Sequence, residues 1–228
     1  MAQDLVGQRI LVTSGPTRAN IDAVRFISNR SSGRLGRTIS RKALALGAHV
    51  TMVAGHGSVT PDPDELTEDE ADRLGVLPVE TVSDLIQTLD TELTNRPPYS
   101  AVVHAMAVLD YVPVREEAGK VRSGRDTWEL KLTRTPKVIR KIKEWSPRTF
   151  LVGFKLEVEK SDDQLQKIAT AMMKDTRSDL VVANDLSRIR DEQHPALILG
   201  TGGNIVSSPE TKGEIAAELC AIFGRVLE

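Results

Sequence analysis

The chain has 228 residues, of which 40% are hydrophobic and 27% charged, and its formal net charge at pH 7 is -2. This composition is typical of a globular protein with a full hydrophobic core, and the length suits a single open α/β domain. Lys+Arg total 30 against Asp+Glu 32, so no basic excess favours nucleic acid or an anionic membrane as a partner. Any anion-binding site must therefore be local.

The single cysteine, Cys220, lies in an apolar run near the C-terminal end. Its surroundings predict a buried structural thiol rather than a nucleophile, because no positive group nearby lowers its pKa. No run approaches the roughly 20 apolar residues that a membrane span requires, and the polar first residues lack the features of a secretory signal. We therefore expect a cytoplasmic protein without disulfides.

Short β-branched apolar runs alternate along the chain with longer segments of helical period. This alternation predicts one Rossmann-like α/β domain over residues 1–228, with a mainly parallel sheet and helices on both faces. The predicted strands span 9–14, 49–55, 75–81, 100–107, 149–157 and 179–185. The predicted helices span 33–47, 82–95, 136–145, 161–176 and 209–226, and a C-terminal hairpin is expected over 196–208.

Two segments interrupt the alternation. Residues 60–73 form an acidic run with two prolines, which predicts a solvated loop or the start of an exposed helix. Residues 111–128 are polar and longer than the usual connection of about 4–6 residues, so we expect a flap that leaves the sheet. Long loops of this kind are often functional.

Ligands of open α/β sheets bind at the carboxyl ends of the strands. The first predicted strand runs into Gly15-Pro16-Thr17-Arg18. Gly15 allows a close backbone approach to a ligand, while Thr17 and Arg18 offer a hydroxyl and a planar cation to an oxyanion. The alternative is an ordinary turn with a solvent-facing arginine.

Residues 26–36, FISNRSSGRLG, predict a loop that leads into a helix. Free N–H groups and the positive end of a helix dipole favour a phosphate, and Ser31, Ser32 and Gly33 leave room for one. A serine that merely caps the helix is the alternative interpretation.

The fourth predicted strand ends before Asp110, a carboxylate suited to bind a ligand or a metal-bound phosphate, and a cap or turn residue is the alternative. His104 is expected to be a core histidine rather than a catalyst, and the four histidines of the chain show no metal-ligand spacing. In the predicted flap, Lys120 and Arg122 could close over a phosphate or simply be solvated.

A nicotinamide dehydrogenase would carry G-x-G-x-x-G after the first strand and an acidic residue where the second strand ends. The sequence has SGPTR at the first position, and HVTMVAGHG ends without Asp or Glu. The residues alone thus predict an α/β anion site for a nucleotide or a phosphorylated metabolite, and they name no reaction.

Six blocks in order, LVTSGPTRANIDAVRFISNRSSGRLG, HAMAVLDYVPV, KVRS, TRTPKVI, LVGFKLE and DLVVANDL, resemble the phosphopantothenate-cysteine ligases, in particular the free-standing bacterial form. The resemblance implies an enzyme of coenzyme A biosynthesis. CTP or ATP, with Mg2+, would activate the carboxylate of 4'-phosphopantothenate as an acyl-nucleotidylate and release pyrophosphate. The amine of L-cysteine would then displace CMP or AMP. A homodimer is implied as well, and a non-catalytic nucleotide-binding regulatory relative is the alternative.

The resemblance also implies roles for individual residues. Asn29 is expected to act in turning over the acyl-nucleotidylate, and Lys120 corresponds to the first lysine of a cationic flap motif. Together with the residue patterns above, it predicts nucleotide contacts at Gly15, Thr17, Arg18, Ser31, Ser32, Gly33, Ala105, Met106, Ala107, Asp110, Thr135, Pro136, Lys137, Val138 and Phe154. Substrate contacts are expected at Asn29, Arg30, Ala183 and Asn184, and no protein ligand is assigned to the metal.

Overall fold

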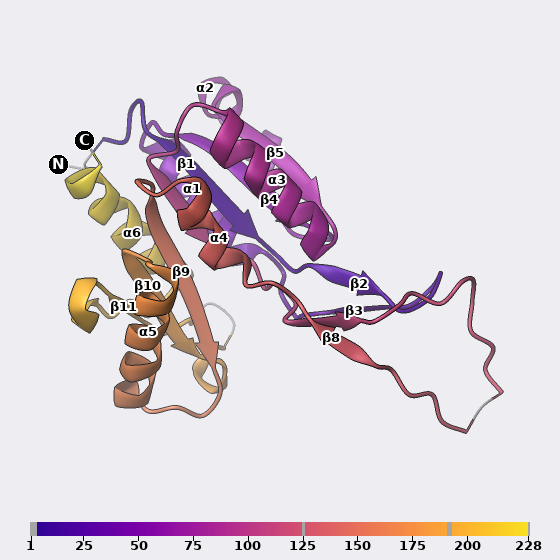
Figure 1. Ribbon diagram of the computed structural model, residues 1–228. Coiled ribbons are helices and arrows are strands. Elements are labelled where there is room, and N and C mark those ends of the chain that lie inside the picture. Colours follow the sequence, from indigo (N-terminus) through magenta and orange to yellow (C-terminus); the bar gives the residue numbers. More distant parts are fainter. Residues whose placement is uncertain (1–3, 125, 191–192, 228) are drawn as a thin grey trace.

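The computed structural model describes residues 4–124, 126–190 and 193–227. Its centre is an eight-stranded sheet in the order β12-β11-β10-β9-β6-β1-β4-β5 (Figure 1). The strands of this sheet are β1 (Arg9–Ser14), β4 (His49–Gly55), β5 (Leu74–Val79), β6 (Ala101–His104), β9 (Phe150–Glu157), β10 (Leu180–Asp185), β11 (Ala196–Leu199) and β12 (Ile205–Ser207). Six strands of this sheet are parallel, namely β5, β4, β1, β6, β9 and β10. Strands β11 and β12 add an antiparallel edge. The predicted α/β class and the C-terminal hairpin are confirmed.

Helices cover both faces of the sheet. The α-helices are α1 (Arg34–Ala45), α2 (Glu68–Asp72), α3 (Val82–Asn95), α4 (Val138–Trp145), α5 (Asp162–Thr176) and α6 (Lys212–Val226), and short 3-10 turns are η1 (Pro63–Glu65), η2 (Leu186–Arg188) and η3 (Thr201–Gly203). Ile10 and Val12 of β1 pack with α1 and α6, while Leu11 between them packs with α3 and α4. Met172 of α5 contacts the α3–α4 core, so α5 lies on that second face. Successive side chains of a strand point to opposite faces, and helices cover both faces. The strands are therefore apolar throughout.

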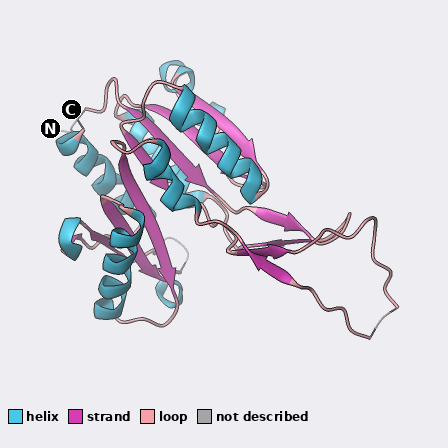
Figure 2. Ribbon diagram, viewed as in Figure 1, coloured by secondary structure: helices cyan, strands magenta, loops and turns pink. Residues whose placement is uncertain are grey.

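Two short antiparallel pairs, β2 (Arg18–Asn20) with β3 (Phe26–Ser28) and β7 (Tyr111–Pro113) with β8 (Leu132–Arg134), leave the carboxyl end of the sheet. We call residues 18–28 and 111–134 together the arm (Figure 2). The flap expected over 111–128 is therefore longer than predicted. Its partner β2–β3 was missed, because each strand has only three residues, too few for a periodic signal.

The acidic run folds into η1 and α2, and α2 begins with a capping box formed by Thr67 and Glu70. The run is also fastened to α1, because the Glu65 carboxylate accepts hydrogen bonds from Arg37 and Arg41. The prediction of an exposed helix start is confirmed by α2, which has no buried residue. Among the described residues, no helix is both long enough and apolar enough to span a membrane.

Cys220 is fully buried in α6, and burial raises the pKa of its thiol to about 12. A thiol with such a pKa stays protonated at neutral pH and is a poor nucleophile. The prediction of a structural cysteine is confirmed.

Candidate functional site

The parallel strands follow the order β5-β4-β1-β6-β9-β10, so the chain runs outward in opposite directions from the neighbours β1 and β6. In open α/β sheets such a reversal leaves a crevice at the carboxyl ends of the two strands, and ligands bind there. The residues that leave β1 and β6 therefore form the candidate site. The first predicted residues it brings together are Gly15, Thr17, Ala105, Met106 and Ala107.

The two strand exits are joined by a ladder of hydrogen bonds. The amide of Ala107 donates to the Gly15 carbonyl at 2.8 Å, and the amide of Leu109 donates to Thr17 Oγ1 at 2.9 Å. Thr17 is fully buried, so its hydroxyl already has a partner within the chain. Met106 is also buried, with 7% exposure. The nucleotide contacts expected at these positions remain predictions. Since Thr17 and Met106 are buried, such contacts would come from the exposed groups of the two strand exits.

Beneath this ladder lies His104, whose side chain is 7% exposed. Its Nδ1 lies 2.9 Å from Thr13 Oγ1, and the same hydroxyl accepts the amide of Met106 at 3.3 Å. The threonine hydroxyl can donate to Nδ1 or accept from it, depending on the tautomer of the ring. Burial lowers the pKa of His104 to about 4, so the ring is neutral at pH 7. His104 is a core histidine, as predicted.

Asn29 lies over the exit of β6. Its Nδ2 donates to the carbonyl oxygens of Ala107 at 3.2 Å and Val108 at 3.1 Å. The residue is otherwise exposed. The structure thus places the amide that the sequence singled out at the mouth of the crevice, held by the segment predicted to contact the nucleotide.

Helix α1 begins beside Asn29 with an uncapped amino end. Its N-cap is Gly33 at φ 77°, and no side chain accepts a hydrogen bond there. The alternative that Ser31 or Ser32 caps the helix is therefore wrong. Within the described ranges no side chain bonds the first amides of the helix, and Ser32 and Arg30 are exposed. This end can accept an anion.

Glycines allow α1 to start directly against β1. A Cβ atom on Gly36 would lie 2.2 Å from Ser14 Oγ, and one on Gly15, at φ 79°, would lie 1.5 Å from Ser58 Oγ. The close approach expected at Gly15 is therefore made by the chain's own loop after β4. Ser58 also lies close to Gly33, so this loop forms one wall beside the start of α1. The sequence held no local signal for that contact.

Arg18 does not face solvent. Its Nε donates to Glu80 Oε1 at 2.5 Å, and its guanidinium lies 4.9 Å from the ring centroid of Phe26. The alternative of a solvent-facing arginine is wrong. Arg18 instead links the arm to the exit of β5.

On the far side of the crevice, Asp110 and Lys137 form an exposed ion pair at 2.5 Å. Thr135 Oγ1 donates to the Leu109 carbonyl at 2.6 Å, and its amide donates to the Asp110 carbonyl at 2.9 Å. Pro136 is exposed, whereas Val138 is only 2% exposed and packs in the core. A ligand could reach Val138 only through its backbone.

Strands β9 and β10 carry the remaining predicted contacts. Phe154 is half-buried and packs against the core. Ala183 is fully buried beside α5. Asn184 is 5% exposed, and its Nδ2 lies 3.2 Å from His194 Nε2. These residues lie on the strands that follow β6 in the sheet order, and the described contacts test none of their expected roles.

Lys120 is exposed and lies in the long loop of the arm between β7 and β8. Its neighbours contact the turn after β2, since the Ala23 amide donates to the Gly119 carbonyl at 3.3 Å. The three residues of β3 separate that turn from Asn29, which corresponds to about 10 Å at roughly 3.3 Å per residue. Figure 1 shows the loop extending outward from the sheet. The single chain does not bring Lys120 and Asn29 together.

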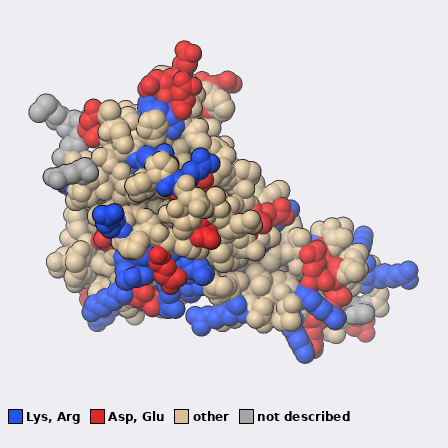
Figure 3. All heavy atoms as spheres, turned by 45° about the horizontal axis from the view of Figure 1, so that its top comes forward, with Lys and Arg blue, Asp and Glu red and all other residues tan. Residues whose placement is uncertain are grey.

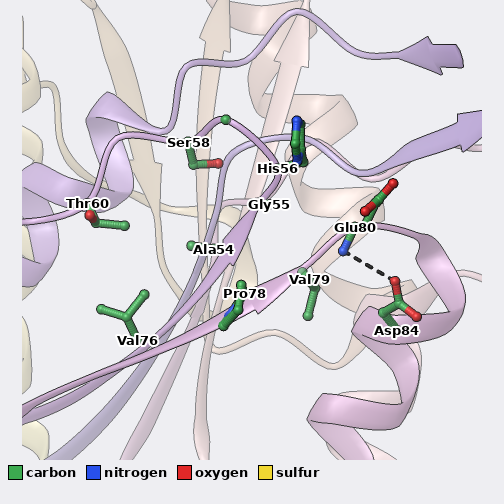
Figure 4. Close-up of a pocket in the computed structure, with 11 residues that line it drawn as sticks. Ala54, Gly55, His56, Ser58, Thr60, Val76, Pro78, Val79, Glu80 and Asp84 are labelled. Atoms are coloured by element: carbon green, nitrogen blue, oxygen red, sulfur yellow. Dashed lines mark hydrogen bonds between the residues drawn. The ribbon is translucent and has the colours of Figure 1, made fainter. Parts of the chain in front are cut away.

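A pocket of about 410 Å³ that sequence reasoning did not predict lies above β4 and β5, on the other side of β1 from β6. Figure 4 shows His56, Ser58 and Glu80 around it. Ser58 belongs to the wall shared with α1, and Glu80 is the partner of Arg18. The pocket therefore adjoins the candidate site through two of its side chains.

On the face drawn in Figure 3, both basic and acidic side chains lie on the body and on the arm, and acidic ones gather at the top. In the described part of the chain, no group of three or more His, Cys, Asp or Glu side chains is placed to hold a metal ion.

Comparison with known proteins identifies relatives over nearly the whole chain. The family model described as "DNA/pantothenate metabolism flavoprotein C-terminal domain" matches residues 5–225. The "Coenzyme A biosynthesis bifunctional protein CoaBC" of Thermococcus kodakarensis is 36% identical over 217 residues, which cover 95% of this chain and 51% of that protein.

Two solved structures agree with this match. The DNA/pantothenate metabolism flavoprotein from Streptococcus pneumoniae superimposes with a TM-score of 0.85 at 31% identity, over 96% of this chain and 99% of that one. The C-terminal domain of a CoaBC protein superimposes with a TM-score of 0.78 at 27% identity, over 99% of this chain and 98% of that one. The chain spans about half the length of the curated relatives it matches.

Proposed function

Because the chain belongs to the family of the DNA/pantothenate metabolism flavoprotein C-terminal domain, we propose that it is a phosphopantothenate-cysteine ligase. In this proposal the enzyme uses CTP or ATP to join 4'-phosphopantothenate to L-cysteine in coenzyme A biosynthesis. Its relatives named for coenzyme A biosynthesis support the pathway. The observation that carries the proposal is the Asn29 amide, held at the crevice mouth beside the uncapped start of α1.

The first step forms the acyl-nucleotidylate. A carboxylate oxygen of phosphopantothenate attacks the α-phosphorus, the bond to the β-phosphate oxygen breaks, and pyrophosphate leaves. A carboxyl group with a pKa near 4 is already ionised at neutral pH, so this step needs no general base. It needs charge neutralisation and alignment of the reacting groups. The free amides of α1, Arg30 and the arm's Lys120 would supply the positive charge, with Ser31 and Ser32 as hydroxyl donors.

The nucleotide would bring Mg2+ with it. Since the described residues form no carboxylate or histidine cluster for a metal, the ion would be held mainly by phosphate oxygens and water, as is common for Mg2+. Asp110 is the carboxylate of the crevice that could add to this shell, after releasing Lys137. Bound there, the ion would neutralise charge on the triphosphate.

The second step forms the amide bond. The cysteine nitrogen attacks the acyl carbonyl, the oxyanion that results is stabilised by a hydrogen bond, and the bond to the nucleotide phosphate then breaks. The amine loses one proton, and CMP or AMP leaves. Asn29 Nδ2 would turn from the Ala107 and Val108 carbonyls to this oxyanion. An oriented donor of this kind stabilises the transition state more than the ground state.

A pyrophosphate-release assay tests the proposal. The protein is incubated with phosphopantothenate, L-cysteine and Mg2+, with CTP in one series and ATP in the other, and the ligated product is identified by mass spectrometry. We expect release with at least one nucleotide. No release with either would refute the ligase, and nucleotide binding without turnover would identify a regulatory relative instead.

The arm supports a further part of the proposal, a homodimer. Large apolar side chains are exposed along it: Val24, Phe26, Tyr111, Val114, Leu130 and Leu132. Monomeric proteins rarely expose so many apolar groups on one projecting element. A second copy that covers the arm would also let Lys120 act at the partner's crevice, which explains why one chain keeps it apart from Asn29.

A further inference from the structure

Asp22 is a buried carboxylate in the most exposed part of the molecule. It lies in the turn between β2 and β3, and its side chain is 0% exposed although Ala23 and Val24 beside it are exposed. An ionised group is not buried without partners, because desolvation is unfavourable. The arm must therefore provide hydrogen-bond and charge partners for this carboxylate.

The two oxygens of Asp22 have different partners. Oδ1 accepts the amides of Val24 at 2.9 Å and Arg25 at 2.8 Å, which are contacts within the turn itself. Oδ2 accepts the amide of Val121 at 3.1 Å, from the long loop, and pairs with Arg25 Nη1 at 2.5 Å. One oxygen thus shapes the turn, and the other joins the turn to the loop.

Further contacts follow the same line. The Glu117 amide donates to the Ile21 carbonyl at 2.9 Å, and the Ala23 amide donates to the Gly119 carbonyl at 3.3 Å. The guanidinium of Arg25 also lies 5.3 Å from the ring centroid of Trp128. We call the contacts between residues 21–25 and 117–121 the turn–loop junction. The backbone on both sides of Lys120, at positions 119 and 121, is fixed by it.

Asp22 is ionised at neutral pH. Burial raises the pKa of its carboxyl, but the three amides and the Arg25 charge outweigh this effect and hold the pKa below its usual value. Lys120 makes no ion pair with this carboxylate, and its exposed ammonium has no partner among the described residues. The junction therefore holds the lysine's backbone while leaving its charge available.

We propose that Asp22 is the positioning residue for Lys120: its Oδ2 fixes the long loop so that the lysine is presented at a defined point of the arm. The catalytic part of this inference rests on the proposed ligase function. The conformational part does not, since it concerns only the contact between two segments of the arm.

Asp22→Asn separates the two roles of the side chain. Its carbonyl oxygen can keep the bonds to Val24 and Arg25, while an NH2 group in place of Oδ2 faces the Val121 N–H and loses the ion pair. The matched control is Glu116→Gln, an exposed position in the same loop whose side chain has no partner among the described contacts. Both variants remove one negative charge from the arm.

Hydrogen exchange of the 228-residue chain, followed by mass spectrometry, tests the junction. We expect exchange at residues 117–123 to rise about tenfold or more in Asp22→Asn, the scale of losing a hydrogen bond to a charged group, with β1 and β6 unchanged. Glu116→Gln should match the wild type. Unchanged exchange at residues 117–123 in Asp22→Asn would overturn the inference, and this readout needs no catalytic activity.

A double-mutant cycle tests the link to Lys120. If Asp22 acts through the lysine, Lys120→Gln lowers pyrophosphate release much less in the Asp22→Asn background than in the wild type. Full additivity of the two losses, or normal turnover of Asp22→Asn despite faster exchange, would overturn the positioning role. A wild-type protein that releases no pyrophosphate would refute the ligase proposal instead, and the exchange result alone would then decide on the junction.

Discussion

Asn29 donates two hydrogen bonds, and a carbonyl oxygen of a ligand at the crevice could replace either of the present acceptors. Both go from Nδ2 to backbone carbonyls, and the residue is otherwise exposed. The sequence predicted the importance of this residue only through resemblance, because its partners Ala107 and Val108 lie 78 and 79 positions away. A local pattern cannot report such contacts.

Replacing Asn29 by alanine should leave nucleotide binding largely intact and lower product formation by about 100-fold or more, the scale of losing an oxyanion donor. Calorimetric titration with CTP or ATP and the pyrophosphate assay measure the two effects separately. Asn95→Ala, at the exposed end of α3, is the control. Undiminished turnover of Asn29→Ala would remove the residue from the mechanism.

Lys120→Gln should slow the first half-reaction, because a cation that faces the triphosphate is lost. Pyrophosphate released in the absence of cysteine, in a single turnover, reports this step directly. Lys131→Gln changes another exposed lysine of the arm, one without a side-chain partner among the described residues, and should behave like the wild type. Normal formation of the acyl-nucleotidylate in Lys120→Gln would contradict the assignment.

Asp185 is an ionised anchor at the end of β10. Its carboxylate accepts hydrogen bonds from the Ser187 hydroxyl and the Lys160 amide, which lower its pKa to about 2. A folded-state pKa below the unfolded value of about 3.9 means that this group stabilises the fold fully above about pH 4 and loses the contribution as pH falls toward 2.

Asp185→Asn should therefore lower the melting temperature at pH 7, and its difference from the wild type should shrink between pH 4 and pH 2. Thermal unfolding at a series of pH values measures both. Asp90→Asn, an exposed position on α3 whose side chain has no partner among the residues described, should change little. A difference that stays constant down to pH 2 would show that the Asp185 charge is not the cause.

At the scale of elements, the start of α1 shows what a sequence can and cannot specify. The buried strands β1 and β4 match their predicted bounds, because continuous β-branched runs mark strands buried on both faces. The predicted strand over 100–107 is shorter in the structure, where β6 spans Ala101–His104. Helix α1 was predicted. Its close contact with Ser14, however, depends on Gly36 and on strand β1, which lies more than twenty residues earlier.

Gly36→Ala tests that contact. Its Cβ would lie 2.2 Å from Ser14 Oγ and 2.5 Å from Ser14 Cβ, so the helix must shift, and we expect a loss of about 1–3 kcal/mol in the free energy of unfolding. Gly213→Ala in α6 meets nothing closer than 3.8 Å and should be neutral or stabilising by up to about 1 kcal/mol. Urea denaturation measures both, and equal stability of the two variants would contradict the tight packing.

At the scale of the whole molecule, a compact sheet carries one projecting arm, and the proposed site needs parts of both. The sequence predicted the sheet and its covering helices, because the apolar residues of the strands and of the helices recur in regular patterns. It predicted only half of the arm, because β2 and β3 are stabilised by partners elsewhere in the chain, such as Glu80 for Arg18. The approach of Ser58 to the site was unpredictable for the same reason.

The arm leads to a prediction about assembly. We expect the protein to be a dimer in solution and Phe26→Asp to weaken it at least about tenfold, since a charge would replace an apolar contact. Val226→Asp, an exposed position at the end of α6 far from the arm in Figure 1, is the control. Sedimentation equilibrium distinguishes the two, and a wild-type monomer at micromolar concentration would reject the prediction.

The ladder between the exits of β1 and β6 has a consequence for how a nucleotide is received. Because the amides of residues 105, 107 and 109 are already bonded to β1 and the turn that follows it, the floor of the proposed nucleotide site is already hydrogen-bonded within the chain. Little entropy is lost in ordering that floor on binding. The heat and entropy of association should therefore report mainly on the arm, and shortening its loop should change them far more than altering the floor.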